Sequence, residues 1–397
     1  MKDYKFHTAL NNIKNDCISW NKEYLLFFSQ EIYSRRDQAL SLKETARLIL
    51  SIFIFPNFKN KKKIFFFQGL RHSEYFNNFE KDTVVIIGSK VEKKFAVEHG
   101  FHFISSFSIA ASVKALVYRD SSFVLKIIFS RWINYLKTIE SSVFLIYEDT
   151  QPVGTFLNYL SQTCSDNSHA ICIQHAFYAK PNYPTRLEGR KTEFNFILNE
   201  SQGELIQPNF SKTSIVGLPY SISAKKGEIR SVILVGVGGV FYDNKVFRDS
   251  IDCFKKIYSI ISQNFDLEII YRPHPNELQF PEIMQELSDN FKIIDTMEIV
   301  DRLNDSRSIF IGVASSVLFQ AEIAGHPVAC FHADHTQEAI LSDSSKILQM
   351  PNFYDLQEWI EDLRQNSTPK ETNDDSLQKD PLKIFDQAMS EFYAAIK

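Results

Sequence analysis

From Lys63 onward the chain alternates short apolar runs with longer segments whose apolar residues recur at helical spacing. Such runs, with few polar residues at alternate positions, are typical of parallel strands buried on both faces. Strands that alternate with helices form parallel sheets wrapped by those helices. The sequence therefore predicts an α/β protein. The predicted strands lie at 64–67, 83–89, 143–146, 170–173, 194–198, 232–235, 267–271 and 308–313.

Length, charge and cysteine usage limit the class of protein. The 397 residues leave room for two domains of about 100–200 residues each. The formal charge of −4, from 44 basic and 48 acidic residues, gives no global field that would attract nucleic acid, so we expect no nucleic-acid partner. Five scattered cysteines without a CxxC pair argue against a disulfide framework or a zinc knuckle and indicate a reducing compartment. The polar N-terminus has no apolar signal core, and we expect a cytoplasmic protein.

A pair of serines follows the last predicted strand. Ser315 and Ser316 stand where apolar residues at helical spacing begin, and Gly325 and Pro327 supply the stop signals of that helix. Backbone N–H groups, the positive end of the helix dipole and two hydroxyls would then converge on one spot, which suits a phosphate. Serines at this position also serve simply as helix caps, and the sequence leaves that alternative open.

The strand at 267–271 leads into a histidine between two prolines. Pro273 and Pro275 fix the backbone on either side of His274 and prevent helical continuation. The imidazole can donate a hydrogen bond to a phosphate oxygen, and Arg272 adds a planar cationic fork. A stiff turn with an incidental histidine is the alternative.

The segment Arg-Pro-His-Pro, followed by a Ser-Ser pair in the next strand-to-helix unit, resembles the His-Pro and Ser-Ser motifs of bacterial GT-B glycosyltransferases that build capsule and lipopolysaccharide. Sialyltransferases and Kdo transferases, which use CMP-sugars, are the most similar in kind, and polymerases that use CDP-glycerol carry a similar pair. The resemblance covers roughly residues 60 to 345. It implies two Rossmann-like domains facing a central cleft, with an N-terminal helical extension and a C-terminal helix.

The domain organisation follows from the spacing of apolar residues along the chain and from this resemblance. Helical spacing dominates residues 1–58, which we expect to form the helical extension. The stretch 213–219 resembles the last strand of a GT-B N-terminal domain, so the acceptor domain is expected at 59–222 and the nucleotide-sugar domain at 223–345. Residues 346–397 are expected to hold a polar flexible loop and a terminal helix that packs back across the domains.

Two carboxylates follow the strand at 143–146. The stretch Tyr147-Glu148-Asp149 is similar to the Tyr-Asp-Asp segment that holds the general base in some bacterial sialyltransferases, although Thr150-Gln151 replaces Gly-Ser here. Glu148 and Asp149 are therefore the predicted catalytic bases that remove the acceptor proton. Acidic residues after a strand also cap helices, which is the alternative.

The remaining predicted site residues lie at other strand ends. Gln174-His175 resembles the Gln-His-Gly element of surface-polysaccharide transferases, and His175 is predicted to act as a base, hold the acceptor or orient Glu148 unless it is simply buried and hydrogen-bonded. Gln174 and Arg71 are the predicted acceptor-binding residues. Glu322 resembles in position the acidic residue that holds a nucleotide ribose, and a surface charge is its alternative. The nucleotide- and phosphate-binding set is Arg272, His274, Pro275, Ser315, Ser316, Glu322 and the loop glycines Gly238 and Gly239, which permit close backbone approach.

The resemblance implies a metal-independent transfer from a nucleotide sugar, with a CMP-sugar such as CMP-sialic acid or CMP-Kdo favoured, to a glycan or lipid-linked glycan acceptor. No cofactor or metal is expected, because no Asp-x-Asp motif stands at a strand end, and a metal site at His332, Asp334 and His335 is the less favoured alternative. CDP-glycerol or CDP-ribitol phosphotransfer, UDP-sugar epimerisation and non-catalytic nucleotide-sugar binding in an assembly complex stay open.

One apolar stretch suggests a membrane contact. Residues 48–55 are followed by Lys59, Lys61, Lys62 and Lys63, and such a segment could lie against an anionic membrane face. It is far shorter than the roughly 20 residues that span a bilayer. A core segment with a solvated linker is the alternative, so the protein is expected in the cytoplasm with an optional contact to the inner membrane face.

Overall fold

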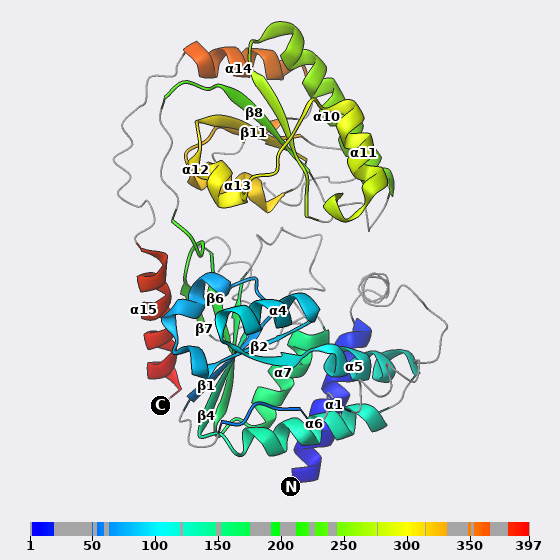
Figure 1. The fold of residues 1–397 in the computed structure, drawn as a ribbon, viewed down its shortest axis with the longest axis vertical. Helices are drawn as coiled ribbons and strands as arrows, with labels where there is room; N and C mark the ends of the chain where they lie inside the picture. Colours follow the sequence, from blue (N-terminus) through cyan, green and yellow to red (C-terminus); the bar gives the residue numbers. More distant parts are fainter. Residues whose placement is uncertain are drawn as a thin grey trace. The chain divides into compact units, whose positions relative to one another are not determined.

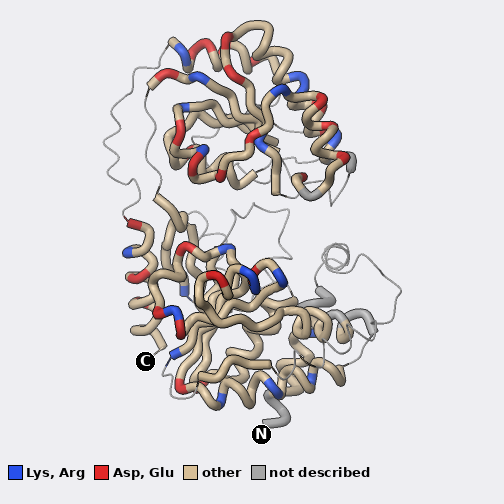
Figure 2. Tube along the Cα trace, viewed as in Figure 1, with Lys and Arg blue, Asp and Glu red and all other residues tan. Residues whose placement is uncertain are grey.

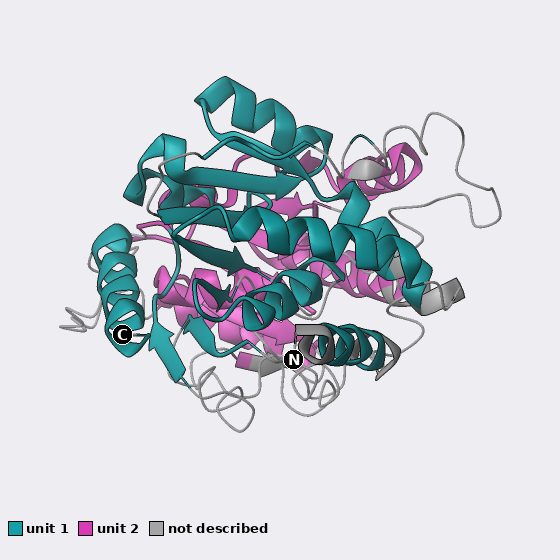
Figure 3. Ribbon diagram, turned by 90° about the horizontal axis from the view of Figure 1, so that it is seen from below, with its two compact units in different colours: residues 1–175, 183–219, 380–397 teal, residues 176–182, 220–379 magenta. Residues whose placement is uncertain are grey.

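The chain folds into two compact units in a computed structural model (Figure 3). The structure describes residues 2–19, 50, 54–58, 63–119, 122–147, 152–174, 192–198, 212–221, 227–236, 244–275, 277–313, 315–331, 348–350, 353–365 and 380–396. Of these, unit 1 contains the residues up to Gln174, residues 192–219 and the C-terminal helix, and unit 2 contains residues 220–365. The expected α/β class is confirmed, because each unit is built on its own parallel sheet.

Unit 1 has a seven-stranded sheet in the order β3-β2-β1-β4-β5-β6-β7, with every pair parallel (Figure 1). The strand order reverses direction between β1 and β4, as in a Rossmann fold. The strands are apolar throughout because helices cover both faces. They are β1 (Lys63–Gln68), β2 (Val84–Gly88), β3 (His102–Ser105), β4 (Ser141–Ile146), β5 (Ser168–Ile173), β6 (Phe194–Ile197) and β7 (Lys212–Ile215).

One face of this sheet is covered by α1, α5, α6 and α7, and the other by α4, the 3₁₀ segment η1 and α15. The capping box of Ser89 and Glu92 starts α4, and Gly100 ends it with a φ of 77°. These helices are α1 (Lys2–Ser19), α4 (Lys90–His99), α5 (Phe107–Arg119), α6 (Phe123–Leu136), α7 (Pro152–Thr163) and α15 (Pro381–Ala395), with η1 (Ser73–Asn78) and η2 (Lys81–Thr83) between β1 and β2.

The ends of the chain both belong to unit 1. Ala9, Leu10 and Ile13 of α1 are buried in the same core as α5 and α7, so the described part of the expected N-terminal extension is integral to this unit. At the other end, the Tyr75 and Phe385 rings stack with centroids 4.0 Å apart and fix α15 to unit 1. The expected C-terminal segment 346–397 is therefore divided between the units, because α14 packs in unit 2.

Unit 2 has a six-stranded parallel sheet in the order β10-β9-β8-β11-β12-β13, with the reversal between β8 and β11. Apolar residues that recur at helical spacing between Phe247 and Ile261 form the buried face of α10. The elements are β8 (Ser231–Val235), α10 (Asn244–Asn264), β9 (Glu268–Arg272), η5 (Glu277–Gln279), α11 (Pro281–Asn290), β10 (Ile293–Ile294), α12 (Ile299–Asn304), β11 (Ser308–Gly312), α13 (Ser316–Ile323), β12 (Val328–Phe331), β13 (Leu348–Met350) and α14 (Tyr354–Gln365).

Two Rossmann-like units, with a final helix that returns from the second to the first, constitute the GT-B architecture expected from the sequence. Among the described residues, none of the helices is both long and apolar enough to cross a membrane.

Candidate functional site

The two strand-end motifs of unit 2 lie at the same edge of one sheet. Arg272 of β9 is in register with Val235 of β8, and Val235 is in register with Gly312 of β11. These three residues thus form one row at the carboxyl ends of neighbouring parallel strands. With a strand spacing of about 4.8 Å, the outer members of the row stand roughly 10 Å apart. Ligands of open α/β sheets bind at this edge, where the strand order reverses.

His274 is held by a reciprocal pair of hydrogen bonds with Glu277. The Glu277 carboxylate accepts from the His274 backbone N–H at 2.8 Å, and the Glu277 N–H donates to the His274 carbonyl oxygen at 2.8 Å. The two bonds close a tight turn from His274 to Glu277, which is the first residue of η5. Sequence reasoning missed Glu277, although an acidic residue three positions after His274 is placed to return its carboxylate to that backbone N–H.

Glu277 is completely buried, and its carboxylate also accepts from the Tyr271 hydroxyl at 3.2 Å. Burial, followed by the nearby Glu277 carboxylate, raises the pKa of Tyr271 well above its ordinary value. The phenol therefore stays protonated and acts as a donor. The turn that carries His274 is thus fixed by the buried Glu277 carboxylate, which accepts from both the Tyr271 hydroxyl and the His274 backbone N–H.

Gly236 makes this packing possible. Its N–H donates to the Arg272 carbonyl oxygen at 2.9 Å, and a Cβ at this position would stand 2.8 Å from the His274 backbone nitrogen and still closer to the Glu277 carboxylate. Real Cβ atoms do not approach backbone nitrogen so closely, so only glycine fits. The absence of a side chain at Gly236, at the end of β8, therefore lets the His-Pro turn pack directly against it.

Ser315 is the N-cap of α13. Its hydroxyl oxygen accepts from the Val317 N–H at 3.3 Å, so Ser315 does cap this helix, and its role as a phosphate ligand stays a prediction. The hydroxyl proton of Ser315 is not used by this bond, and Ser316 begins the helix beside it. Both are partly exposed. Glu322 is half-buried six residues further on, about 9 Å along the helix axis from Ser316.

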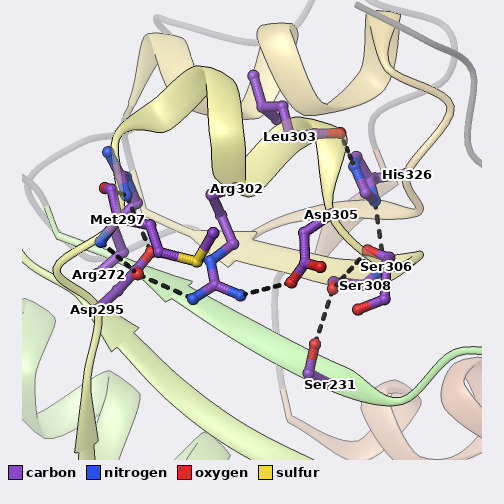
Figure 4. Close-up of polar contacts among 10 residues, drawn as sticks. All are labelled: Ser231, Arg272, Asp295, Met297, Arg302, Leu303, Asp305, Ser306, Ser308 and His326. Carbon is purple, nitrogen blue, oxygen red and sulfur yellow. Dashed lines mark hydrogen bonds and ion pairs between the residues drawn. The ribbon is translucent and has the colours of Figure 1, made fainter.

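The Arg272 guanidinium is engaged within unit 2 (Figure 4). Its Nη1 donates to Asp295 Oδ2 at 2.9 Å and to the Met297 carbonyl oxygen at 2.8 Å. The same carboxylate binds Arg302, whose Nη2 lies 2.9 Å from Oδ1, and Arg302 also reaches Asp305 at 3.2 Å. The Asp295 side chain is fully buried. Arg272 as a phosphate ligand stays a prediction, and what the structure shows is its bond to Asp295.

Burial on its own would raise the pKa of Asp295, but hydrogen bonds from Arg302, the Met297 N–H and Arg272 outweigh it, and the pKa lies below the ordinary value. The charged form is thus more favourable in the folded chain than in the unfolded one. Through these bonds the Asp295 carboxylate connects β9, the segment around Met297 and Arg302 of α12. Arg272, the residue of β9 in this network, is two positions before His274.

Unit 2 is expected to lose stability in acid because of Asp295. With a folded pKa below the unfolded value of about 3.9, its contribution is complete above pH ~4 and is lost as the pH falls through the folded pKa. Urea unfolding between neutral pH and pH ~2.5 measures the loss. The Asp295→Asn variant is the control and should show a smaller change over the acid range. An equal change in both proteins would contradict the assignment.

In unit 1, the described predicted residues also lie at the carboxyl edge of the sheet. Arg71, which follows β1, places its guanidinium carbon 5.2 Å from the centroid of the Tyr147 ring, which follows β4. Gln174, which follows β5, is buried, and its Oε1 accepts from the Leu198 N–H at 3.0 Å. Gln174 thereby joins the ends of β5 and β6, and its role in acceptor binding stays a prediction.

The other predicted positions lie outside the described residues. They are the catalytic candidates Glu148, Asp149 and His175, the loop glycines Gly238 and Gly239, and the alternative metal ligands His332, Asp334 and His335. Within the described part of the chain, no group of three or more His, Cys, Asp or Glu residues is placed to hold a metal ion.

Comparison with known proteins shows a likeness of fold at low identity. No family model matches the chain, and no curated protein matches it. The calicheamicin glycosyltransferase CalG4 aligns with a TM-score of 0.43 and 12% identity over 84% of this chain and 98% of that one. The spinosyn forosaminyltransferase SpnP gives 0.42 and 10% over 84% and 99%. A chain of the GtfA/B complex gives 0.36 and 10% over 68% of this chain and only 60% of its own length. At these values the likeness says nothing about activity.

Proposed function

We propose that the chain is a metal-independent glycosyltransferase that transfers a sugar from a nucleotide donor to a cell-surface glycan acceptor. The observation that supports this proposal is the row at the edge of unit 2. The His-Pro turn and the serine-capped start of α13 flank Gly236 at the point where the strand order reverses. A rigid imidazole turn and a helix N-terminus at one edge suit the leaving phosphate of a nucleotide sugar.

In the proposed reaction, the acceptor hydroxyl oxygen attacks the anomeric carbon and the bond from that carbon to the phosphate oxygen breaks. The electron pair of the broken bond goes to the phosphate, where His274, Ser315, Ser316 and the first N–H groups of α13 would stabilise the charge. Glu148 or Asp149 would take the acceptor proton, with His175 orienting or replacing them. Arg71 and Gln174 would hold the acceptor.

A CMP-sugar, such as CMP-sialic acid or CMP-Kdo, is the donor that we favour. Of the cations near the motif, Arg272 already bonds to Asp295, so a site built from one histidine and one helix start suits a monophosphate better than a diphosphate. The acceptor would be a glycan or lipid-linked glycan of capsule or lipopolysaccharide, and the enzyme would work in the cytoplasm at the inner membrane face. Residues 48–55 and the following lysines would supply that contact.

A thermal-shift panel of CMP, CDP, UDP and GDP on the full chain tests the donor. At a concentration of 100 times Kd the preferred nucleotide stabilises by about 2.7 kcal/mol. For a unit of this size that corresponds to a rise in Tm of about 5–10 °C. We expect CMP to give the largest shift and the His274→Ala variant to lose it. A panel in which none of the nucleotides shifts Tm would contradict the proposal.

Turnover separates the transferase from its alternatives. An epimerase converts a UDP-sugar without any acceptor, and a CDP-glycerol phosphotransferase requires CDP-glycerol or CDP-ribitol as donor. A non-catalytic assembly protein would bind nucleotide without turnover, whereas the transferase should lose turnover but keep CMP binding when Glu148 or Asp149 is replaced by Ala. We expect activity to persist in EDTA, and loss that magnesium or manganese restores would refute the metal-independent site.

A further inference from the structure

The outward face of α6 in unit 1 carries large apolar side chains. Phe123 is 70% exposed and Ile127 is 38% exposed, although both belong to types that are usually buried. At 100° per residue, Phe123, Ile127, Ser130 and Asn134 form one stripe along the helix. The opposite face packs into the core through Leu125, Ile128, Phe129, Trp132 and Leu136. The exposed stripe thus carries two large apolar side chains in its first half, on a helix whose main apolar face is already buried.

Cations flank this stripe on both sides. Helical geometry places Lys126 and Lys137 along one flank and Arg131 along the other. No Asp or Glu occurs between Ser122 and Ile139, in a chain whose net charge is −4. Along α6, Figure 2 accordingly shows Lys and Arg positions without acidic ones. A helix with exposed apolar side chains and cations on either side of them is the pattern of a segment that lies in the interface of an anionic membrane.

The segment before β1 meets the same helix. The Phe55 ring lies 4.5 Å from that of Tyr135 and 5.2 Å from that of Trp132, measured between centroids. Its neighbour Ile54 is 62% exposed. Phe55, the last residue of the apolar stretch that the sequence indicates as a possible membrane contact, thus packs against α6.

We propose that the outward face of α6, formed by Phe123, Lys126, Ile127, Arg131 and Lys137, docks unit 1 on an anionic lipid surface. Charge complementarity selects this occupant, because three cations with no intervening carboxylate fit lipid phosphates, and the exposed aromatic ring fits the boundary between headgroups and acyl chains. The proposal depends on the described residues of α6 and not on the proposed transfer reaction.

Sedimentation of the full chain with vesicles tests this surface. The probes are phosphatidylcholine vesicles with and without phosphatidylglycerol, at low salt and at about 1 M salt, where the Debye length falls to ~3 Å. We expect binding only with phosphatidylglycerol and only at low salt. Replacing Lys126, Arg131 and Lys137 together by Gln should weaken it by about fivefold per cation, on the order of 100-fold in total. Phe123→Ser should weaken it by about tenfold.

Matched controls make the outcome decisive. Replacing Lys90, Lys93 and Lys94 of α4 by Gln removes the same charge from the same unit, beside the exposed Val91 and Val97, and should leave binding nearly unchanged. All substituted side chains are exposed except Lys126, which is partly exposed, so unchanged circular-dichroism melting is expected and is checked for each variant. The proposal is overturned if phosphatidylglycerol does not increase vesicle binding, or if the α4 variant loses as much vesicle binding as the α6 variant. It is also overturned if the chain does not bind vesicles but self-associates, and Phe123→Ser abolishes that self-association.

Discussion

Replacing Asp295 by Ala is expected to destabilise unit 2 by about 3–5 kcal/mol, the largest effect on stability that we foresee. The substitution leaves the buried Arg302 guanidinium with only the half-exposed Asp305 carboxylate, and it removes one of the two acceptors of Arg272 Nη1 and the acceptor of the Met297 N–H. A buried cation that loses its buried partner costs more than the pair itself contributes, because the desolvation penalty remains when the partner is gone. A typical domain has only about 5–15 kcal/mol of stability in total.

Urea denaturation followed by circular dichroism measures this loss. Asp301→Asn is the matched control, since Asp301 is an exposed acidic residue of the neighbouring helix α12 and should change stability by less than about 0.5 kcal/mol. We expect the Asp295→Ala transition to divide into an early step for unit 2 and a late step at the wild-type midpoint of unit 1. A variant that unfolds like wild type would show that the buried network contributes nothing.

Gly236→Ala is expected to lower kcat/KM by about 100-fold, the largest effect on activity from a residue that lies outside the predicted site. The added methyl group would stand 2.8 Å from the His274 backbone nitrogen and within contact of the buried Glu277 carboxylate. Since neither backbone nor a buried carboxylate yields easily, the His-Pro turn must shift. Displacement of a binding group by about 1 Å is enough for a loss of this size.

A double-mutant cycle separates this clash from a general loss of stability. Glu277→Ala removes the carboxylate that the new methyl group would meet, so Gly236→Ala should cost less in the Glu277→Ala background than in wild type. Gly312→Ala is the matched control, because the three heavy atoms nearest to its Cβ, at 3.0–3.3 Å, are side-chain carbons of Leu318 and not backbone. Strictly additive effects at the two sites, measured by nucleotide binding and by urea midpoint, would contradict the proposed contact.

The described strands and helices agree closely with the pattern of apolar residues in the sequence where every residue of a strand, or the whole inner face of a helix, is buried. The predicted strands at 64–67, 232–235 and 308–313 are β1, β8 and β11 within one or two residues at each end. Phe247, Ile251 and the following apolar residues are buried on α10 as the spacing predicts. In contrast, β3, β10, β12 and β13 were not predicted. Each has at most four residues, so its apolar signal is short, and β3 and β10 together have only one fully buried residue.

The candidate site was predicted in its positions and less well in its contacts. His274 and the Ser315–Ser316 pair do lie at one edge of one sheet, as their place after predicted strands implies. The roles of neighbouring groups differ: the Arg272 side chain is bound to Asp295, and the unpredicted Glu277 fixes the turn. In the sequence, Arg272 stands close to His274, and the two look like parts of one cationic site. The partner that binds the Arg272 side chain, Asp295, is 23 residues away along the chain, so the local sequence does not reveal it.

The amino-acid sequence by itself determined the α/β class, the order of the elements and the strand ends at which the two motifs stand. These properties depend on apolar periodicity and on turn residues, which act over a few neighbouring positions. Only the tertiary structure decided that β8 lies between β9 and β11, that Arg272 pairs with Asp295, that Gly236 packs on Glu277, and that the Tyr75 and Phe385 rings join α15 to unit 1. Those contacts join segments far apart in the chain, and their free energy depends on burial and charge pairing that exist only once the segments have packed together.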